Sequence, residues 1–291
     1  MPAVRLPETP IVDIKLPPLP QTISRIARLL GKEDADIQEL IEIVELDPSV
    51  AARLLRHVNS AFYGLPQKIS RVDRAVLLLG FTKVCNLEMA SSMAQIEKVF
   101  KDPGQREVYY QIVRHSLATA MLADELASLL DLTDHKVVFT AGLMHNIGQI
   151  VLLYNSPDMY EALWWSSESG LAPLVEEERV IFGKDHHELG LEGATTWSFP
   201  EELQLTIAHY DTPQACEDSP WFEVVCTVGA CVPLARALYP NNPDGVDTSQ
   251  IEALPEMLLH LNRPEEQIQD AWNQILEHRE KTRLFVQQML G

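Results

Sequence analysis

The chain has 291 residues, of which 46% are apolar, and its 42 acidic and 23 basic side chains give a net charge of −19. All of the acidic surplus lies beyond residue 100, because residues 1–100 hold 12 basic and 12 acidic side chains and the remaining residues hold 11 and 30. The acidic part of the chain beyond residue 100 would repel the phosphate backbone of a nucleic acid. We therefore expect no direct binding of DNA or RNA.

Apolar residues recur at helical spacing along the whole chain, and capping residues separate the runs. Asp47-Pro48 is a strong helix start, because the aspartate can accept from first-turn N–H groups and proline at the first helical position loses no hydrogen bond. No convincing period-two strand interrupts the pattern, which predicts an all-α fold. The predicted helices cover about residues 23–30, 37–44, 49–63, 70–80, 82–100, 105–131, 133–153, 157–169, 173–182, 186–197, 201–210, 220–239, 249–260 and 264–290.

The clearest internal boundary is Lys101-Asp102-Pro103-Gly104, where proline and glycine adjoin and the charge balance changes just beyond. We predict one helical lobe before this boundary and a second lobe after it.

Histidine is the residue type on which any metal chemistry would depend. His115 lies in a long apolar segment, His145 in the middle of another, His186 at a predicted helix start and His209 near a helix end. Their spacing has no local signature such as HExxH, and each histidine taken alone is more often a core or surface residue than a ligand. The chain also has no GxSxG elbow and no Gly-rich phosphate loop. Only the combination of these histidines is informative.

Several short motifs occur together in one order along the chain. They are Leu16-Pro17-Pro18-Leu19-Pro20, Asp47-Pro48, Leu54-Leu55, Asn59 to Gly64, Ile69-Ser70, Ala75 to Gly80, Arg114-His115-Ser116, Gly142 to Gly148, His186 to Gly190, Trp197 to Pro200 and His209-Tyr210. In this combination the chain resembles the HDOD family, the HD-related output domains of bacterial signalling proteins, over about residues 16–212.

The resemblance implies an all-α, two-lobed, multi-helix HDOD fold. Its amino-terminal lobe would occupy residues 16–100, and its second lobe, an HD-phosphohydrolase-like helical bundle, residues 101–212. Residues 213–291 fall outside the resemblance and are expected to form a C-terminal helical extension.

The resemblance also implies a set of metal-site positions. In the HD phosphohydrolases and the cyclic-di-GMP-cleaving HD-GYP enzymes, a first His, a His-Asp pair and a later Asp hold one metal ion, and further histidines hold a second. His115 matches the first His and His145 the histidine of the pair. His186 and His209 match the two additional histidines.

Two positions depart from the enzyme pattern. Asn146 stands where the paired aspartate is expected, and the chain near the later aspartate offers Cys231 and no carboxylate. A neutral amide oxygen donates much more weakly to a divalent ion than a carboxylate does. We therefore expect no resident cofactor, with a single divalent transition metal held mainly by imidazoles as the alternative. Asp211 is a candidate carboxylate beside the later histidines.

The leading hypothesis is a catalytically degenerate HDOD signal-transduction protein, a regulatory scaffold that binds a protein partner or a small effector through the seam between its lobes. Asn59, Tyr63 and Arg56 form a candidate binding surface, although Asn59 is better suited to satisfying backbone groups. The alternative is a metal-dependent phosphohydrolase that cleaves a nucleotide or cyclic-dinucleotide phosphodiester with an altered ligand set. A third hypothesis is nucleotide binding without cleavage, by arginines of the neutral first lobe.

Three further features bear on where the protein works. The first ten residues have no apolar core of the kind found in signal peptides. The longest apolar stretch, from Val137 to Tyr154, is interrupted by polar residues and is typical of a buried helix. The four cysteines form no CxxC pair. We expect a cytoplasmic protein with no membrane contact.

Overall fold

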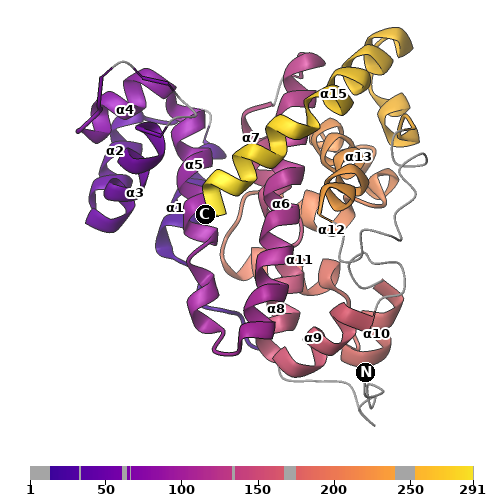
Figure 1. Ribbon diagram of the computed structural model, residues 1–291. Coiled ribbons are helices and arrows are strands. Elements are labelled where there is room, and N and C mark those ends of the chain that lie inside the picture. Colours follow the sequence, from indigo (N-terminus) through magenta and orange to yellow (C-terminus); the bar gives the residue numbers. More distant parts are fainter. Residues whose placement is uncertain are drawn as a thin grey trace.

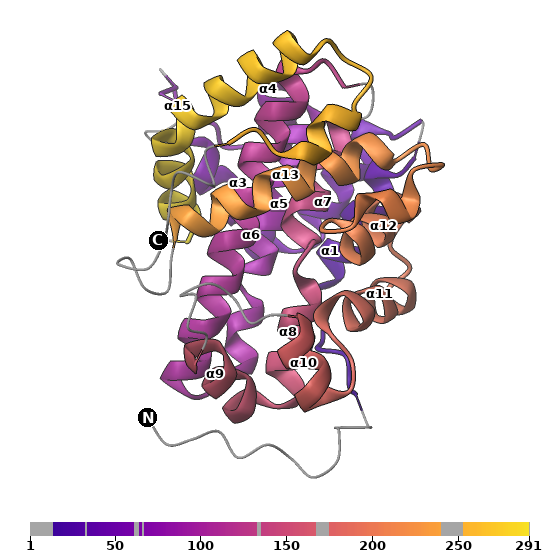
Figure 2. The same ribbon diagram turned by 90° about the vertical axis from the view of Figure 1, so that its right-hand side faces the viewer.

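A computed structural model describes residues 14–32, 34–60, 64–65, 67–132, 135–166, 175–239 and 253–290 (Figures 1 and 2). The regular structure in these ranges is helical throughout and contains no strand, which confirms the predicted all-α class.

The first lobe is built around a buried central helix. Its helices are α1 (Gln21–Leu30), α2 (Ile37–Glu45), α3 (Pro48–Val58), α4 (Val72–Leu79) and α5 (Phe81–Met93), followed by the 3-10 turn η1 (Ile96–Val99). The other four helices all contact α5, whose residues from Val84 to Met93 are buried. Asp47 caps α3, since its side chain accepts from the Ser49 N–H at 2.8 Å with Pro48 in the first turn. The start signal at Asp47-Pro48 is thereby confirmed.

The second lobe is a bundle built along the longest helix, α6 (Pro103–Leu129). Asp102 caps α6 by accepting from the Gly104 N–H at 2.8 Å. The remaining elements are α7 (His135–Met144), α8 (Ile147–Asn155), α9 (Pro157–Ser166), α10 (Val175–Phe182), α11 (His186–Thr196), α12 (Glu201–His209), η2 (Pro213–Cys216), α13 (Phe222–Leu238), η4 (Glu256–His260) and α15 (Glu265–Leu290).

The segment predicted as a C-terminal extension lies against this bundle. Both α13 and α15 contact α6, and α13 also contacts α7 and α12. Figures 1 and 2 show α15 crossing over α6 while α13 lies close beside it. Helices from beyond residue 213 therefore complete the core around α6.

The predicted helix over residues 133–153 is wrong in one important respect. The chain forms two helices there, α7 and α8, and the break between them falls at His145 and Asn146. Asn146 has φ −101° and ψ 16°, so it leaves the helical path and becomes the N-cap residue of α8. The stretch Lys136–Asn155 is long and apolar enough to cross a membrane, but 94% of its most apolar window is buried inside the fold.

Other predicted helices also differ from the structure. The helix predicted over residues 49–63 corresponds to α3, which ends at Val58. The helix predicted to open at Ser70 begins at Val72, after Arg71 in extended conformation. The segment 82–100 is α5 followed by η1, and the described end of the segment 249–260 is the 3-10 turn η4, which follows Pro255. Proline fixes φ and cannot donate a hydrogen bond, so it favours such a boundary.

Glycines permit two close helix contacts that position the site. A Cβ atom added to Gly142 in α7 would lie 2.8 Å from the Ala120 Cα of α6. A Cβ added to Gly148 in α8 would lie 1.8 Å from the carbonyl oxygen of His186, at the start of α11. Because neither contact tolerates a side chain, glycine lets the α7–α8 turn sit between α6 and α11.

Candidate functional site

The first pair of predicted site residues meets in the core of the second lobe. His115 comes from the middle of α6, and His145 follows the last residue of α7. Both side chains are buried, and their Nε2 atoms are 3.2 Å apart. The rings meet edge to face, with centroids 5.1 Å apart. The sequence-based pairing of His115 with His145 therefore corresponds to a direct contact.

The protons on this pair follow from their hydrogen bonds. Nδ1 of His145 lies 2.6 Å from the carbonyl oxygen of Gly142, which can only accept, so Nδ1 carries a proton. Burial lowers the pKa of His145 to about 3, which leaves the ring neutral and Nε2 unprotonated. His115 must then donate from Nε2 to His145. The lone pair that His145 would offer to a metal ion is thus engaged by a neighbouring N–H.

His186 is held from both sides of its ring. Its Nδ1 lies 2.5 Å from Glu178 Oε2, and the same oxygen accepts the His186 backbone N–H at 2.8 Å. The hydroxyl of Tyr160 donates to the other Glu178 oxygen at 2.8 Å. Glu178 is fully buried, and these donors stabilise its charge. Nδ1 of His186 therefore carries a proton and points toward Glu178.

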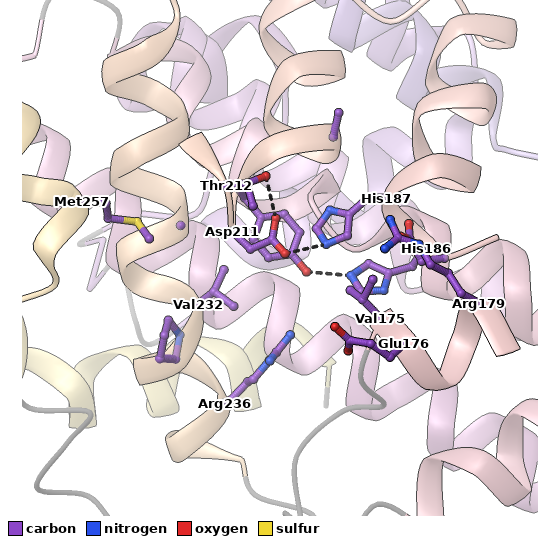
Figure 3. Close-up of a pocket in the computed structure, with 15 residues that line it drawn as sticks. Val175, Glu176, Arg179, His186, His187, Asp211, Thr212, Val232, Arg236 and Met257 are labelled. Carbon is purple, nitrogen blue, oxygen red and sulfur yellow. Dashed lines mark hydrogen bonds and ion pairs between the residues drawn. The ribbon is translucent and has the colours of Figure 1, made fainter. Parts of the chain in front are cut away.

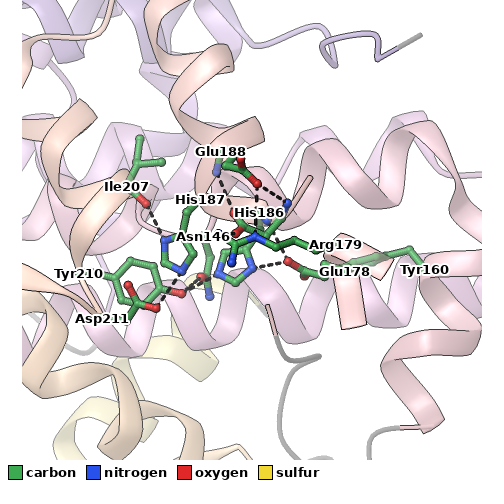
Figure 4. A network of polar contacts seen from close by, with 11 residues as sticks. Asn146, Tyr160, Glu178, Arg179, His186, His187, Glu188, Ile207, Tyr210 and Asp211 are labelled. Carbon is green, nitrogen blue, oxygen red and sulfur yellow. Dashed lines mark hydrogen bonds and ion pairs between the residues drawn. The ribbon is translucent and has the colours of Figure 1, made fainter. Parts of the chain in front are cut away.

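Tyr210 joins His186 to Asn146 (Figure 4). Its hydroxyl lies 2.8 Å from Nε2 of His186 and 3.1 Å from Oδ1 of Asn146. Tyr210 has one proton to give. Either it donates to Asn146 while His186 donates to it, or it donates to His186 while an amide turned about its axis donates to it. In both arrangements Nε2 of His186 is bonded to the tyrosine hydroxyl.

A second ion pair lies beside this network. Nε2 of His187 is 3.2 Å from Asp211 Oδ2, and Nδ1 of His187 is 3.0 Å from the carbonyl oxygen of Ile207. Burial lowers the pKa of His187, but the Asp211 carboxylate outweighs it and the net shift is upward. Asp211, predicted as a supporting carboxylate, thus faces His187 and not His186.

The start of α11 is fixed by a separate set of contacts. Asp185 accepts the Glu188 N–H at 2.9 Å, and the Glu188 side chain accepts the Asp185 N–H at 3.1 Å, which is a capping box. Arg179 of α10 lies 2.5 Å from Asp185. This anchoring holds His186 and His187 at the first turn of α11.

Other residues predicted at the site lie elsewhere. His209 is half-buried at the end of α12 and has no hydrogen bond to another candidate histidine in the described ranges. Cys231 is buried in α13, where burial raises the pKa of its thiol.

The predicted binding surface on the first lobe is only partly described. Asn59 donates to the carbonyl oxygens of Leu55 and Ile69 and accepts the Ile69 N–H, which is the backbone role weighed for it. Arg56 is exposed on α3, and Tyr63 lies outside the described residues.

Four residues of the site were not predicted from the sequence. They are Glu178, His187, Tyr210 and Arg236. His187 and Tyr210 each adjoin a predicted histidine, so the motifs that carry the HDOD resemblance contained both. Glu178 belongs to an acidic run that resembles a solvated surface. A single arginine late in an otherwise apolar helix was the only signal for Arg236.

The donor set does not fit the binuclear metal centre that the resemblance implies. Across the described part of the chain, no group of three His, Cys, Asp or Glu side chains is arranged to hold a metal ion. Protein zinc sites use three or four protein ligands. Here two imidazoles face each other, and the adjacent oxygen belongs to the neutral amide of Asn146.

A cavity of about 550 Å³ opens beside the network (Figure 3). It lies within the second lobe and not at the seam between lobes, with walls from α10, the start of α11, the end of α12, α13 and η4. Its polar lining includes Arg179, His187, Asp211 and Arg236, and Tyr210 and His186 separate it from His145. The site therefore combines a sealed histidine cluster with an accessible pocket.

Comparison with known proteins agrees with this architecture. The structure resembles an HDOD domain protein of unknown function from Geobacter sulfurreducens, at 21% identity and TM-score 0.71, over 94% of this chain and 93% of that one. A Shewanella amazonensis protein provisionally named a phosphohydrolase is similar at 22% identity and TM-score 0.67, over 95% of both chains. Likenesses at these identities show the fold.

An uncharacterized protein of Treponema pallidum is 24% identical over 205 residues, which are 70% of this chain and 39% of that protein. The match thus spans about two fifths of this curated relative. The sequence model of the HDOD domain matches residues 16–213. That match covers more than half of the chain and includes the histidine cluster, and the chain therefore belongs to the HDOD domain family.

Proposed function

We propose that this chain is a non-catalytic HDOD module that acts in bacterial signal transduction by binding a partner. The observation that carries the proposal is the state of two histidine nitrogens. Nε2 of His145 accepts from His115, and Nε2 of His186 is bonded to the Tyr210 hydroxyl. These are the nitrogens that a metal centre at the matching HD positions would use.

The charges of the site support the same proposal. A catalytic divalent ion that activates water needs donors that offset its charge and an open coordination position. Asn146 supplies no charge, and the nearest carboxylates, Glu178 and Asp211, are engaged by His186 and His187. The site therefore offers neither the negative charge nor the free carboxylate that would help to activate a water molecule for attack on a phosphodiester.

One observation favours the alternative, a metal-dependent phosphohydrolase. The 3.2 Å separation of Nε2 in His115 and Nε2 in His145 would also suit two ligands of a single metal ion. The carbonyl of Gly142 orients His145 in the way that backbone groups orient metal-bound histidines. Metal binding would then displace the proton that His115 shares with His145.

The binding partner is either a protein or a small effector. A module that catalyses no reaction transmits a signal by binding, and either kind of partner could receive or deliver that signal. The cavity beside Tyr210 is the recess suited to a small effector. We also expect the protein to work in the cytoplasm, away from membranes and without direct contact to nucleic acid.

The test is a turnover assay with added metal. Purified protein is incubated with cyclic dinucleotides and with a chromogenic phosphodiester in the presence of Mn²⁺, Fe²⁺ or Ni²⁺. We expect no turnover above that of the His145→Ala variant. His278→Ala, which alters a histidine of α15 paired with Glu125, is the matched control. Metal-stimulated turnover that disappears in His145→Ala and persists in His278→Ala would replace the proposal with the phosphohydrolase.

A further inference from the structure

The side chain of Arg236 lines the cavity and has no hydrogen-bond or ion-pair partner among the described residues. It lies near the end of α13 and extends toward the middle of the cavity (Figure 3). Its Nε is buried and has no hydrogen-bond partner, and in the described part of the chain the guanidinium forms no ion pair. A buried N–H group without an acceptor is uncommon in folded proteins.

The other basic groups of the cavity are already paired. Arg179 lies 2.5 Å from Asp185, and His187 lies 3.2 Å from Asp211. Glu176 is exposed at the start of α10. Among the described residues, no carboxylate forms an ion pair with the guanidinium of Arg236. The positive charge of Arg236 also acts on the buried histidines, because it adds to burial in lowering the pKa of His145.

We propose that this cavity binds a small organic molecule with one anionic group, a phosphomonoester or a carboxylate, which Arg236 holds through its guanidinium. Arginine presents paired N–H donors that match both kinds of anion. The inference deepens the proposed function, because it assigns a ligand class to the module, and it needs no metal and no reaction.

The rest of the lining limits the ligand further. Val175, Val232, Pro233 and Met257 give the cavity an apolar wall, so the body of the ligand is apolar or planar. A volume of about 550 Å³ admits a molecule of the size of a nucleotide or smaller. Three carboxylates, from Glu176, Asp185 and Asp211, also line the cavity and repel additional negative charge. A triphosphate or a nucleic acid should therefore bind more weakly than a ligand with one anionic group.

The experiment observes the arginine directly. Spectra of ¹⁵N-labelled protein that record the Nε–Hε groups of arginine are taken during titration with phenyl phosphate, with benzoate and with neutral benzyl alcohol. The Arg236 signal is the one missing from the Arg236→Gln variant. We expect phenyl phosphate or benzoate to shift it saturably and benzyl alcohol to leave it unchanged. The two anionic probes distinguish a phosphomonoester from a carboxylate.

Variants test the role of the guanidinium. Arg236→Gln should weaken binding of the effective anion by at least about tenfold, and Arg236→Lys, which keeps the charge but loses the paired donors, by a smaller factor. Arg71→Gln is the matched control, because Arg71 is an exposed arginine of the first lobe paired with Asp73 at 2.6 Å. Its effect should stay within about twofold.

Val175→Trp should weaken binding by narrowing the cavity while Arg236 is intact. The inference is overturned if neither anion shifts the Arg236 signal, or if Arg236→Gln and wild type bind the anions equally. Failure here would leave the proposed non-catalytic role standing, whereas metal-dependent turnover would remove that role whether or not an anion binds.

Discussion

The hydroxyl of Tyr210 lies 3.1 Å from Oδ1 of Asn146, the residue that stands where the HD enzymes carry an aspartate. In those enzymes the carboxylate faces a cation, whereas here the amide faces a phenol. Both groups are neutral and both are buried, so the contact needs no ion to stabilise it. The same hydroxyl also contacts Nε2 of His186. One tyrosine thus contacts two side chains that stand at metal-ligand positions of the HD enzymes.

Removing the Tyr210 hydroxyl should therefore destabilise the fold. Tyr210→Phe would leave polar atoms of Asn146 and His186 buried without a partner, and we expect the free energy of unfolding to fall by about 1–3 kcal/mol. Urea denaturation measures this change. Tyr154→Phe, at a half-buried tyrosine of α8, should change stability by less than about 0.5 kcal/mol. Equal stability of Tyr210→Phe and wild type would show that the network contributes little.

Restoring the carboxylate should favour metal binding. Asn146→Asp places a negative charge beside His115 and His145, and we expect Mn²⁺ or Fe²⁺ to bind at least about tenfold more tightly than to wild type, as measured by calorimetry. The metal-free variant should be less stable than wild type, because the new charge is buried. Asn273→Asp, at an exposed position of α15, should alter neither property. Unchanged metal affinity in Asn146→Asp would argue against the assigned ancestry of this position.

The contact between α8 and α11 should not accept a methyl group. Gly148→Ala would bring its Cβ to 1.8 Å from the carbonyl oxygen of His186, and backbone atoms there cannot move aside without separating the helices. We expect a loss of more than about 3 kcal/mol in the free energy of unfolding.

Gly104→Ala is the matched control for that prediction. The atoms nearest to a Cβ added at Gly104 belong to the flexible carboxylate end of Glu161. Its change in stability should stay within about 1 kcal/mol, with a gain from the higher helix propensity of alanine. Comparable losses in both variants, measured by the same thermal or urea unfolding, would contradict the close contact between α8 and α11.

Glu88 in α5 should make stability depend on pH. Its side chain is fully buried, and neither carboxylate oxygen has a hydrogen-bond partner in the described structure. Burial raises the pKa of Glu88 from 4.5 to about 8, with Arg53 opposing and Asp47 adding to the shift. The folded state therefore holds the proton more tightly than the unfolded state. Stability is full below pH 4.5 and declines as the pH rises toward 8.

Glu88→Gln isolates this contribution. The variant should match wild type near pH 4 and exceed its free energy of unfolding by roughly 5 kcal/mol near pH 9. Glu45→Gln, at an exposed position of α2, should leave the difference between the two pH values unchanged. If Glu88→Gln shows the same pH dependence as wild type, the carboxyl is not neutral in the folded protein.

The sequence predicted the helical class from local patterns, and the resemblance to the HDOD family implied that His115 and His145 share one site. It did not predict the helix break at Asn146, because an apolar stretch with helical spacing gives no sign of a turn inside it. Arg236 and Glu178 were missed for another reason. Each acquires its surroundings only when helices distant in sequence pack together, and single charged residues resemble solvated ones until then.

The metal content of the purified protein tests the central claim most directly. The protein is produced in medium supplemented with Mn²⁺, Fe²⁺, Ni²⁺ and Zn²⁺, purified without chelator and analysed by mass spectrometry of its elements, beside His145→Ala. Since Nε2 of His145 and Nε2 of His186 are engaged within the protein, we predict far less than one metal ion per chain and no difference between the two proteins. One or more ions per chain in wild type, lost in His145→Ala, would contradict the account.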